Sequence, residues 1–275
     1  MVDALNDVDW NCVQVWRVVL GEFIEDALLA ELWSYLSAEE RDRAERFHGA
    51  DLRQDYIVCH AALRSILGHC LGLSPKNIPF RFEPAAVSGG AAGGAATSKP
   101  ALAVRSGSAQ TRLDLRFNLS HTRGAALIAV ALGREVGIDI EWQRPMDDLD
   151  GMARAVMSDE EYGQWLALEQ DSRTIAFYRL WTRKESYLKA IGLGLYRDLH
   201  DVTVPVSPEF LEPSHGVTVK DRTGQGLWTV GDVAVDEPWA ASICCEGAEL
   251  PSVVLRNWKD FNPAQISKTE PDRTL

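Results

Sequence analysis

The segment SDEE, Ser158 to Glu161, repeats the segment SAEE, Ser37 to Glu40, at a distance of 121 residues. The same shift aligns RKESYL (183–188) with ALRSIL (62–67) without a gap. A serine followed three residues later by a glutamate is typical of a capping box, which begins a helix. A helical pattern that ends near a glycine follows each copy. The repeat therefore predicts two related halves within one chain.

Strand patterns complete each half. VQVWRVVL (13–20) alternates as a strand, and LDLRFNLSH, ALIAVAL and GIDIE predict three more strands after the first long helix. After the second long helix, further strands are predicted for VTVPV, GLWTVGDVAV and WAASICC. We predict an α+β fold, a pseudo-twofold pair of similar halves, each with a long helix packed on a small antiparallel sheet.

The predicted halves are residues 1–125 and residues 126–259. Residues 260–275 are polar and predict a loose tail. The segment AAVSGGAAGGAATS (85–98) consists of small residues that bury little apolar surface, which predicts a loop.

Composition excludes several classes of protein. The longest apolar run, AALIAVAL (125–132), is far shorter than the roughly 20 residues of a membrane-spanning helix, and the N-terminus is acidic rather than basic. The five cysteines include no C-x-x-C pair and two of them are adjacent, which suits neither a zinc site nor a disulfide framework. These features predict a cytoplasmic protein.

Charge is distributed unevenly along the chain. The formal net charge of −12 comes mainly from the second half, whereas residues 41–123 carry more Lys and Arg than Asp and Glu. That local excess could receive phosphates or an acidic partner. Scattered, solvated arginines are the alternative explanation.

Two acids lie in the apolar run VGIDIEWQRP (136–145). Because side chains alternate along a strand, Asp139 and Glu141 share one face while the neighbouring isoleucines point to the other. Two close carboxylates raise each other's pKa unless a cation lies between them, and such oxygen pairs suit Mg²⁺. An ordinary exposed strand face is the alternative.

The segment FYRLWTRKESYLKAIGLGL (177–195) has an apolar stripe with Glu185 and Lys189 beside each other at positions i and i+4. An ordinary helix salt bridge would explain this pair. A third carboxylate near Asp139 and Glu141 would instead complete a metal site, and a lysine there could neutralise charge on a phosphate.

In FNLSHT (117–122), Ser120 and His121 occupy the end of a strand, where a hydroxyl, an imidazole and backbone N–H groups can meet an anion. His121 could equally be a turn residue bonded to a carbonyl. The chain has no G-x-S-x-G elbow, no Walker sequence and no G-x-G-x-x-G, so a serine hydrolase and the common nucleotide-binding folds are unsupported.

Taken in order, FNLSH, GIDIE and LWTRKESYLKAIG resemble the three signature blocks of 4′-phosphopantetheinyl transferases, and the chain length is similar to that of the Sfp-type branch. The resemblance implies transfer of the 4′-phosphopantetheine arm from coenzyme A to a serine of an acidic apo carrier protein. Adenosine 3′,5′-bisphosphate would be released. A pseudo-twofold already formed within one chain favours a monomer.

The resemblance also implies roles for particular residues. Asp139, Glu141 and Glu185 would hold Mg²⁺ against the pyrophosphate of coenzyme A. Glu185 would also be the general base for the serine, directly or through water. Lys189 would bind a phosphate and stabilise the leaving charge.

Further coenzyme A contacts follow from the same resemblance. Ser120 and His121 would bind phosphates of the nucleotide, and Arg43 would bind the 3′-phosphate. Lys99 and Pro100 resemble the family's G-K-P motif, which borders the adenine.

Two departures from the family pattern stand out. Ser98 replaces the usual glycine of the G-K-P motif, and Glu40 stands where some relatives have lysine, which removes one phosphate contact. A Mg²⁺-dependent phosphodiesterase that uses water as the nucleophile, and a binding module without chemistry, are the rival interpretations.

Overall fold

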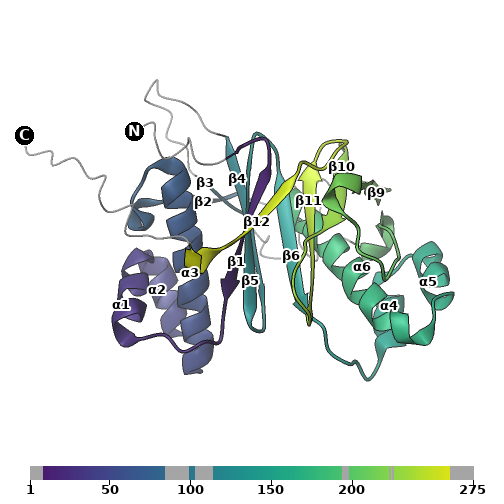
Figure 1. Ribbon diagram of the computed structural model, residues 1–275, viewed down its shortest axis with the longest axis horizontal. Helices are drawn as coiled ribbons and strands as arrows, with labels where there is room; N and C mark the ends of the chain where they lie inside the picture. The colour runs from purple at the N-terminus through teal and green to yellow at the C-terminus, as the bar shows by residue number, and fades with distance from the viewer. Residues whose placement is uncertain are drawn as a thin grey trace, which may run out of the picture.

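The computed structural model describes residues 9–83, 99–102, 114–193, 198–222, 224 and 226–260. The predicted loop at 85–98 and the predicted tail from residue 261 onward lie outside these residues, as does Ser98. Figure 1 shows two sheets side by side in the middle of the molecule, with long helices on the two outer flanks. The fold is mixed α+β, as predicted.

The first sheet has the strand order β12-β1-β5-β4. Its members are β1 (Val13–Val19), β4 (Leu115–Thr122), β5 (Ala125–Leu132) and β12 (Val253–Asn257). β5 pairs antiparallel with both β1 and β4, whereas β12 runs parallel to β1. This sheet is therefore mixed rather than purely antiparallel, because the chain returns from the second half to add its last strand (Figure 1).

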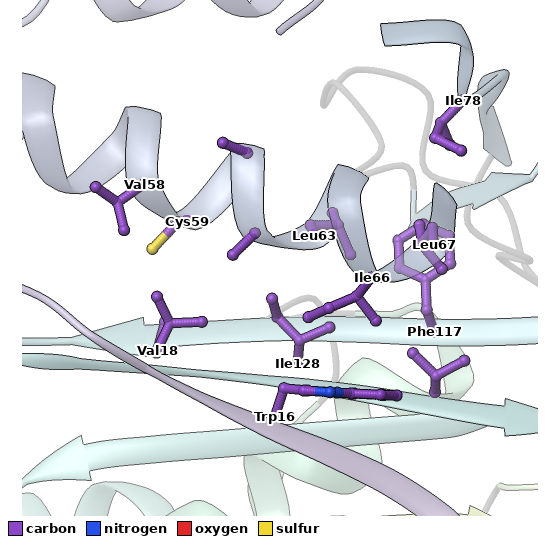
Figure 2. Packing of buried hydrophobic residues seen from close by; sticks show 14 of the residues in the cluster. Trp16, Val18, Val58, Cys59, Leu63, Ile66, Leu67, Ile78, Phe117 and Ile128 are labelled. Atoms are coloured by element: carbon purple, nitrogen blue, oxygen red, sulfur yellow. The ribbon is translucent and has the colours of Figure 1, made fainter. Parts of the chain in front are cut away.

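Three helices lie on one side of the first sheet: α1 (Asp26–Tyr35), α2 (Ala38–Glu45) and α3 (Ala50–Leu71). α3 packs on the sheet, and α1 and α2 pack against α3. Figure 2 shows Val58, Leu63 and Ile66 of α3 directed toward Val18 and Ile128 of the sheet. These side chains are at most 4% exposed. Full burial of such a side chain contributes about 1.5–3 kcal/mol, so this contact fixes α3 on the sheet.

The second sheet has the order β6-β11-β10-β8, with β6 (Val136–Trp142), β8 (Val217–Thr218), β10 (Trp228–Asp232) and β11 (Trp239–Glu246). It is antiparallel throughout. Helices α4 (Leu149–Val156), α5 (Asp159–Leu166) and α6 (Gln170–Ile191) accompany it.

Short elements complete the described chain. β2 (Phe80–Glu83) pairs with β3 (Lys99–Leu102), and β7 (Val202–Thr203) pairs with β9 (Lys220–Asp221). Four 3₁₀ turns are η1 (Pro75–Asn77), η3 (Leu199–Asp201), η4 (Pro213–His215) and η5 (Trp258–Asp260). None of the described helices combines the length and apolar character needed to cross a membrane.

The predicted helix signals are confirmed. Ser37 with Glu40, and Ser158 with Glu161, form complete capping boxes at the starts of α2 and α5. The long helices α3 and α6, 22 residues each, end at Gly72 and Gly192, whose φ angles are +63° and +74°. A left-handed C-cap of this kind strongly favours glycine.

The two sheets meet through a shared apolar layer and through β4 and β6. Val15 and Leu127 of the first sheet pack in one cluster with Ile138, Ile140 and Ile243 of the second. β5 follows the predicted boundary at residue 125 and belongs to the first sheet. The change of sheet therefore occurs between β5 and β6, at residues 133–135.

Candidate active site

Gly137 in β6 brings α6 against the strand. A Cβ atom at this position would lie 2.0 Å from the Ser186 carbonyl oxygen and 2.4 Å from the Ala190 nitrogen. Only glycine permits this close approach of backbone to backbone. As a result Glu185 and Lys189, one turn apart on α6, lie beside Asp139 on β6.

Asp139 is buried and lies at the centre of a hydrogen-bonded group. Its Oδ1 accepts from Lys189 Nζ at 2.5 Å and from Ser120 Oγ at 2.8 Å, and Lys189 Nζ also donates to Ser120 Oγ at 2.8 Å. The Asp139 side chain is 3% exposed. Three predicted site residues from β4, β6 and α6 therefore converge at the junction of the two sheets.

Glu141 and Glu185 interact electrostatically with the same group. Burial, followed by the charge of Asp139, raises the pKa of Glu141, although Trp181, Lys189 and Thr122 lower it. Burial raises the pKa of Glu185 to about 7, with further increases from Asp139 and Glu141 that Lys189 opposes. Each carboxylate thus lies within the field of the others.

Two carboxylate oxygens of this group, Asp139 Oδ2 and Glu185 Oε1, are buried without a hydrogen-bond partner. Buried acceptors of this kind are rare and carry a desolvation cost unless a donor or a cation satisfies them. Over the described parts of the chain, however, no three His, Cys, Asp or Glu side chains form a group that could hold a metal ion. The metal assignment of Asp139, Glu141 and Glu185 stays a prediction.

His121 is exposed at the end of β4, beside several positive charges. Desolvation by surrounding protein atoms lowers the pKa of His121, and the charges of Lys189, His60 and Arg43 lower it further. Arg43 lies over the ring of Tyr56 at 5.8 Å, and Tyr56 stacks on His60 at 4.0 Å. Arg43 and His121 are therefore close enough to interact electrostatically, although Asp55 opposes the effect of the cations, and we call Arg43, His60 and His121 the cationic region.

Glu40 is held inside this region by neighbouring cations. Its Oε2 accepts from Arg64 Nε at 2.6 Å, and its Oε1 lies 3.1 Å from His60 Nδ1. Burial opposes ionisation, yet hydrogen bonds from His60 and Ser37 and the charge of Arg64 lower the pKa of Glu40 to about 2. The residue that departs from the family pattern is thus a structural anion at the start of α2.

Lys99 and Pro100 lie in β3, away from the Asp139 group. Lys99 Nζ donates to Glu135 Oε2 at 2.6 Å, to the Ala190 carbonyl at 3.0 Å and to the Val136 carbonyl at 3.1 Å. These bonds fasten β3 to the end of α6 and the start of β6. Pro100 is opposite Phe82 in the β2–β3 pair. The roles predicted for both residues at the adenine stay predictions.

An open cavity of about 740 Å³ adjoins the site on the side of the second half. Its lining includes Glu141, Thr122 and Trp181, together with Arg144 and Phe177. Trp181 Nε1 donates to Glu141 Oε1 at 3.3 Å. The carboxylates therefore stand at one wall of a space large enough for part of a substrate.

Sequence reasoning missed the contributions of Tyr56, His60 and Thr122 to this region. Tyr56 and His60 belong to the apolar periodicity of α3, so their pattern indicated a core face. Thr122 shares a strand face with Ser120, and this alternation was the available signal.

Comparisons with known proteins identify the family of this chain. Residues 135–244 match the model of the 4′-phosphopantetheinyl transferase superfamily. The 4′-phosphopantetheinyl transferase HetI of Nostoc sp. is 31% identical over 235 residues, covering 86% of this chain and 88% of that protein. Sfp of Bacillus subtilis, another 4′-phosphopantetheinyl transferase, is 28% identical over 218 residues, covering 79% and 85%.

The matched region contains β6, α6 and most of β11, and thus the carboxylates and the lysine described above. The chain belongs to the 4′-phosphopantetheinyl transferase superfamily and is an enzyme of that class.

Proposed function

We propose that this enzyme transfers the 4′-phosphopantetheine arm of coenzyme A to a serine of an apo carrier protein, with Mg²⁺, and releases adenosine 3′,5′-bisphosphate. The observation that carries the proposal is the convergence of Asp139, Glu185 and Lys189 at the sheet junction, beside the cationic region of Arg43 and His121. A diphosphate needs both kinds of group nearby. Cationic side chains neutralise its negative charge, and acidic side chains hold the metal ion that accompanies it.

In the proposed reaction the serine oxygen forms a bond to the phosphorus that bears pantetheine. The bond from that phosphorus to the bridging oxygen breaks, and its electron pair leaves with adenosine 3′,5′-bisphosphate. Glu185 accepts the serine proton, directly or through water. Lys189 stabilises the charge that develops on the departing phosphate.

The nucleotide phosphates would bind on the first half. His121 and Ser120, at the end of β4, and Arg43, at the end of α2, present an imidazole, a hydroxyl and a guanidinium from adjacent elements. Lys99 and Pro100 of β3 would border the adenine. The cavity beside Glu141 lies on the opposite side and leaves space for the pantetheine arm or the carrier.

Asp139, Glu141 and Glu185 would hold Mg²⁺. The buried acceptors Asp139 Oδ2 and Glu185 Oε1, which lack hydrogen-bond partners, fit this assignment, and an all-carboxylate set suits a hard cation. When bound, Mg²⁺ would supply positive charge to the pyrophosphate oxygens.

The remaining sequence predictions fit the same proposal. The corresponding order of capping box, long helix and strands in the two halves supports a pseudo-twofold relation between them. A pair of halves within one chain favours a monomer, and carrier-protein modification favours a cytoplasmic location and an acidic partner.

Intact mass spectrometry tests the proposal. The enzyme is incubated with coenzyme A, Mg²⁺ and a panel of apo carrier proteins, with Asp139→Ala as a parallel sample. We expect a gain of about 340 Da on the carrier serine, and no gain with Asp139→Ala. Free phosphopantetheine with an unmodified carrier would indicate the rival phosphodiesterase, and full transfer by Asp139→Ala would contradict the site assignment.

A further inference from the structure

The two sheets are joined at the site by side chains rather than by strand pairing. Among the strands that the structure describes, β4 pairs with β5 alone and β6 pairs with β11 alone, so their unpaired edges face each other. In an antiparallel strand, alternate N–H groups point away from the paired neighbour, and they require other acceptors when buried. Along the edge of β6 these are the N–H groups of Ile138, Ile140 and Trp142.

Alternate side chains of β4 supply the acceptors. The Ile138 N–H donates to Asn118 Oδ1 at 2.9 Å, and the Trp142 N–H donates to Thr122 Oγ1 at 3.2 Å. Between them, the Ile140 N–H approaches Ser120 Oγ at 3.4 Å. We call Asn118, Ser120 and Thr122 the β4 ladder. Each rung joins residues that are 20 positions apart in the sequence.

The outer two bonds of the β4 ladder are made by residues of β6 that lie just before Asp139 and just after Glu141. The Asn118 rung binds the residue before Asp139, and the Thr122 rung binds the residue after Glu141. Ile138 is fully buried, so loss of its bond to Asn118 would leave a buried N–H without a partner. The Thr122 hydroxyl also lowers the pKa of Glu141 through a side-chain hydrogen bond.

The same strand β4 carries His121 between Ser120 and Thr122. Any slip between β4 and β6 would therefore change the spacing between the cationic region on the first half and the carboxylates on the second. Displacement of reacting groups by about 1 Å can reduce a rate by about 100-fold. We infer that Asn118 and Thr122 are positioning residues, which hold β6 in register with β4 and so set the distance between the acids and the phosphate-binding side.

This inference rests on the proposed function for its rate effect, but not for its structural effect. Thr122→Val removes the hydroxyl at nearly constant volume, and Thr122→Ser restores it. Asn118→Leu removes the other acceptor. Thr229→Val is the matched control, because Thr229 Oγ1 donates to the Gly247 carbonyl at 2.8 Å in β10, a strand of the second sheet not adjacent to β6.

The first measurement is hydrogen–deuterium exchange of the free enzyme, read by mass spectrometry on peptides that cover residues 136–145. We expect faster exchange there in Asn118→Leu and Thr122→Val than in the original protein, and unchanged exchange in Thr122→Ser and Thr229→Val. Unchanged exchange in Asn118→Leu and Thr122→Val would overturn the inference whatever the enzyme's substrate.

The second measurement is the kinetics of carrier modification. We expect Thr122→Val and Asn118→Leu each to lower kcat about tenfold while the KM for coenzyme A changes less than about twofold. Thr122→Ser and Thr229→Val should stay within about twofold of the original kcat. An equal loss in Thr229→Val, or none in Thr122→Val, would contradict a positioning role. An inactive original enzyme would instead count against the proposed function.

Discussion

At the scale of single residues, each capping-box glutamate also forms an ion pair with the long helix that follows it. Glu40 pairs with Arg64 of α3, and Glu161 pairs with Lys184 of α6 at 2.6 Å. Lys184 is completely buried, and burial lowers its pKa despite the charge of Glu161. One side chain thus begins a helix and neutralises a cation on the next long helix, which ties neighbouring helices together.

The stability lost on replacing Glu40 should depend on pH. The pKa of Glu40 is lowered to about 2, so its ionised form stabilises the fold fully above the ordinary carboxyl value of 4.5, and this contribution is lost as the pH falls toward 2. We expect Glu40→Gln to reduce the free energy of unfolding by about 2 kcal/mol at pH 7. The deficit should shrink below pH 4.5.

Urea unfolding between pH 7 and pH 3.5 measures this deficit. Glu45→Gln, at an exposed position of the same helix, provides the control and should leave the free energy of unfolding nearly unchanged. A Glu40→Gln deficit of the same size at every pH would refute the linkage to Glu40 ionisation.

At the scale of elements, the contact between β6 and α6 determines the site. Asp139 and Glu141 come from the strand, and Glu185 and Lys189 come from the helix, so their spacing depends on how closely the two backbones approach. Gly137 sets that approach, because any Cβ there would overlap the backbone of Ser186 and Ala190.

Gly137→Ala should therefore separate strand from helix. We expect a loss of about 1–3 kcal/mol in unfolding free energy, typical of overpacking, together with a large loss of transfer activity. Gly163→Ala is the matched control, because a Cβ at Gly163 in α5 meets no atom within 4 Å. That variant should be neutral or stabilised by up to about 1 kcal/mol. Thermal unfolding, urea unfolding and activity assays of both variants test this prediction. Unchanged stability and activity in Gly137→Ala would show that the close packing is dispensable.

At the scale of the whole molecule, the two halves differ in net charge. The basic excess of residues 41–123 falls on the first half, whereas the second half is acidic. An acidic carrier would be drawn to the first half and repelled by the second.

Arg41 has a structural role, since its guanidinium donates to the carbonyls of Trp33 and Ser34 near the end of α1. Arg46 is exposed and better suited to a test.

Charge reversal at Arg46 should affect the carrier and not the nucleotide. We expect Arg46→Glu to raise the KM for carrier protein about threefold to tenfold at low salt, with the KM for coenzyme A unchanged. Arg154→Glu, exposed on α4 of the second half, is the control and should have a smaller effect. Steady-state kinetics at two salt concentrations separate the two substrates, and an unaltered carrier KM in Arg46→Glu would exclude this approach surface.

Much of the fold could be predicted because its signals are local. The capping boxes at Ser37 and Ser158 and the glycines that end α3 and α6 depend on residues close in sequence. β12 could not be foreseen in the first sheet, since its partner β1 is more than 200 residues away and parallel pairing leaves no local pattern. The assignment of β5 to the first sheet likewise depended on pairing and not on composition.

For the site, the sequence by itself determined the family and the residue types: two acids alternating on a strand, an acid and a lysine one turn apart on a helix, and a serine and histidine at a strand end. Only the tertiary structure decided which of these meet. It placed Ser120, Asp139 and the half-buried Lys189 in one hydrogen-bonded group and tied Lys99 to α6 and β6. The physical reason is that side-chain alternation and helical spacing are properties of neighbouring residues, whereas the approach of β4, β6 and α6 depends on close packing at Gly137 and on hydrogen bonds between distant strands.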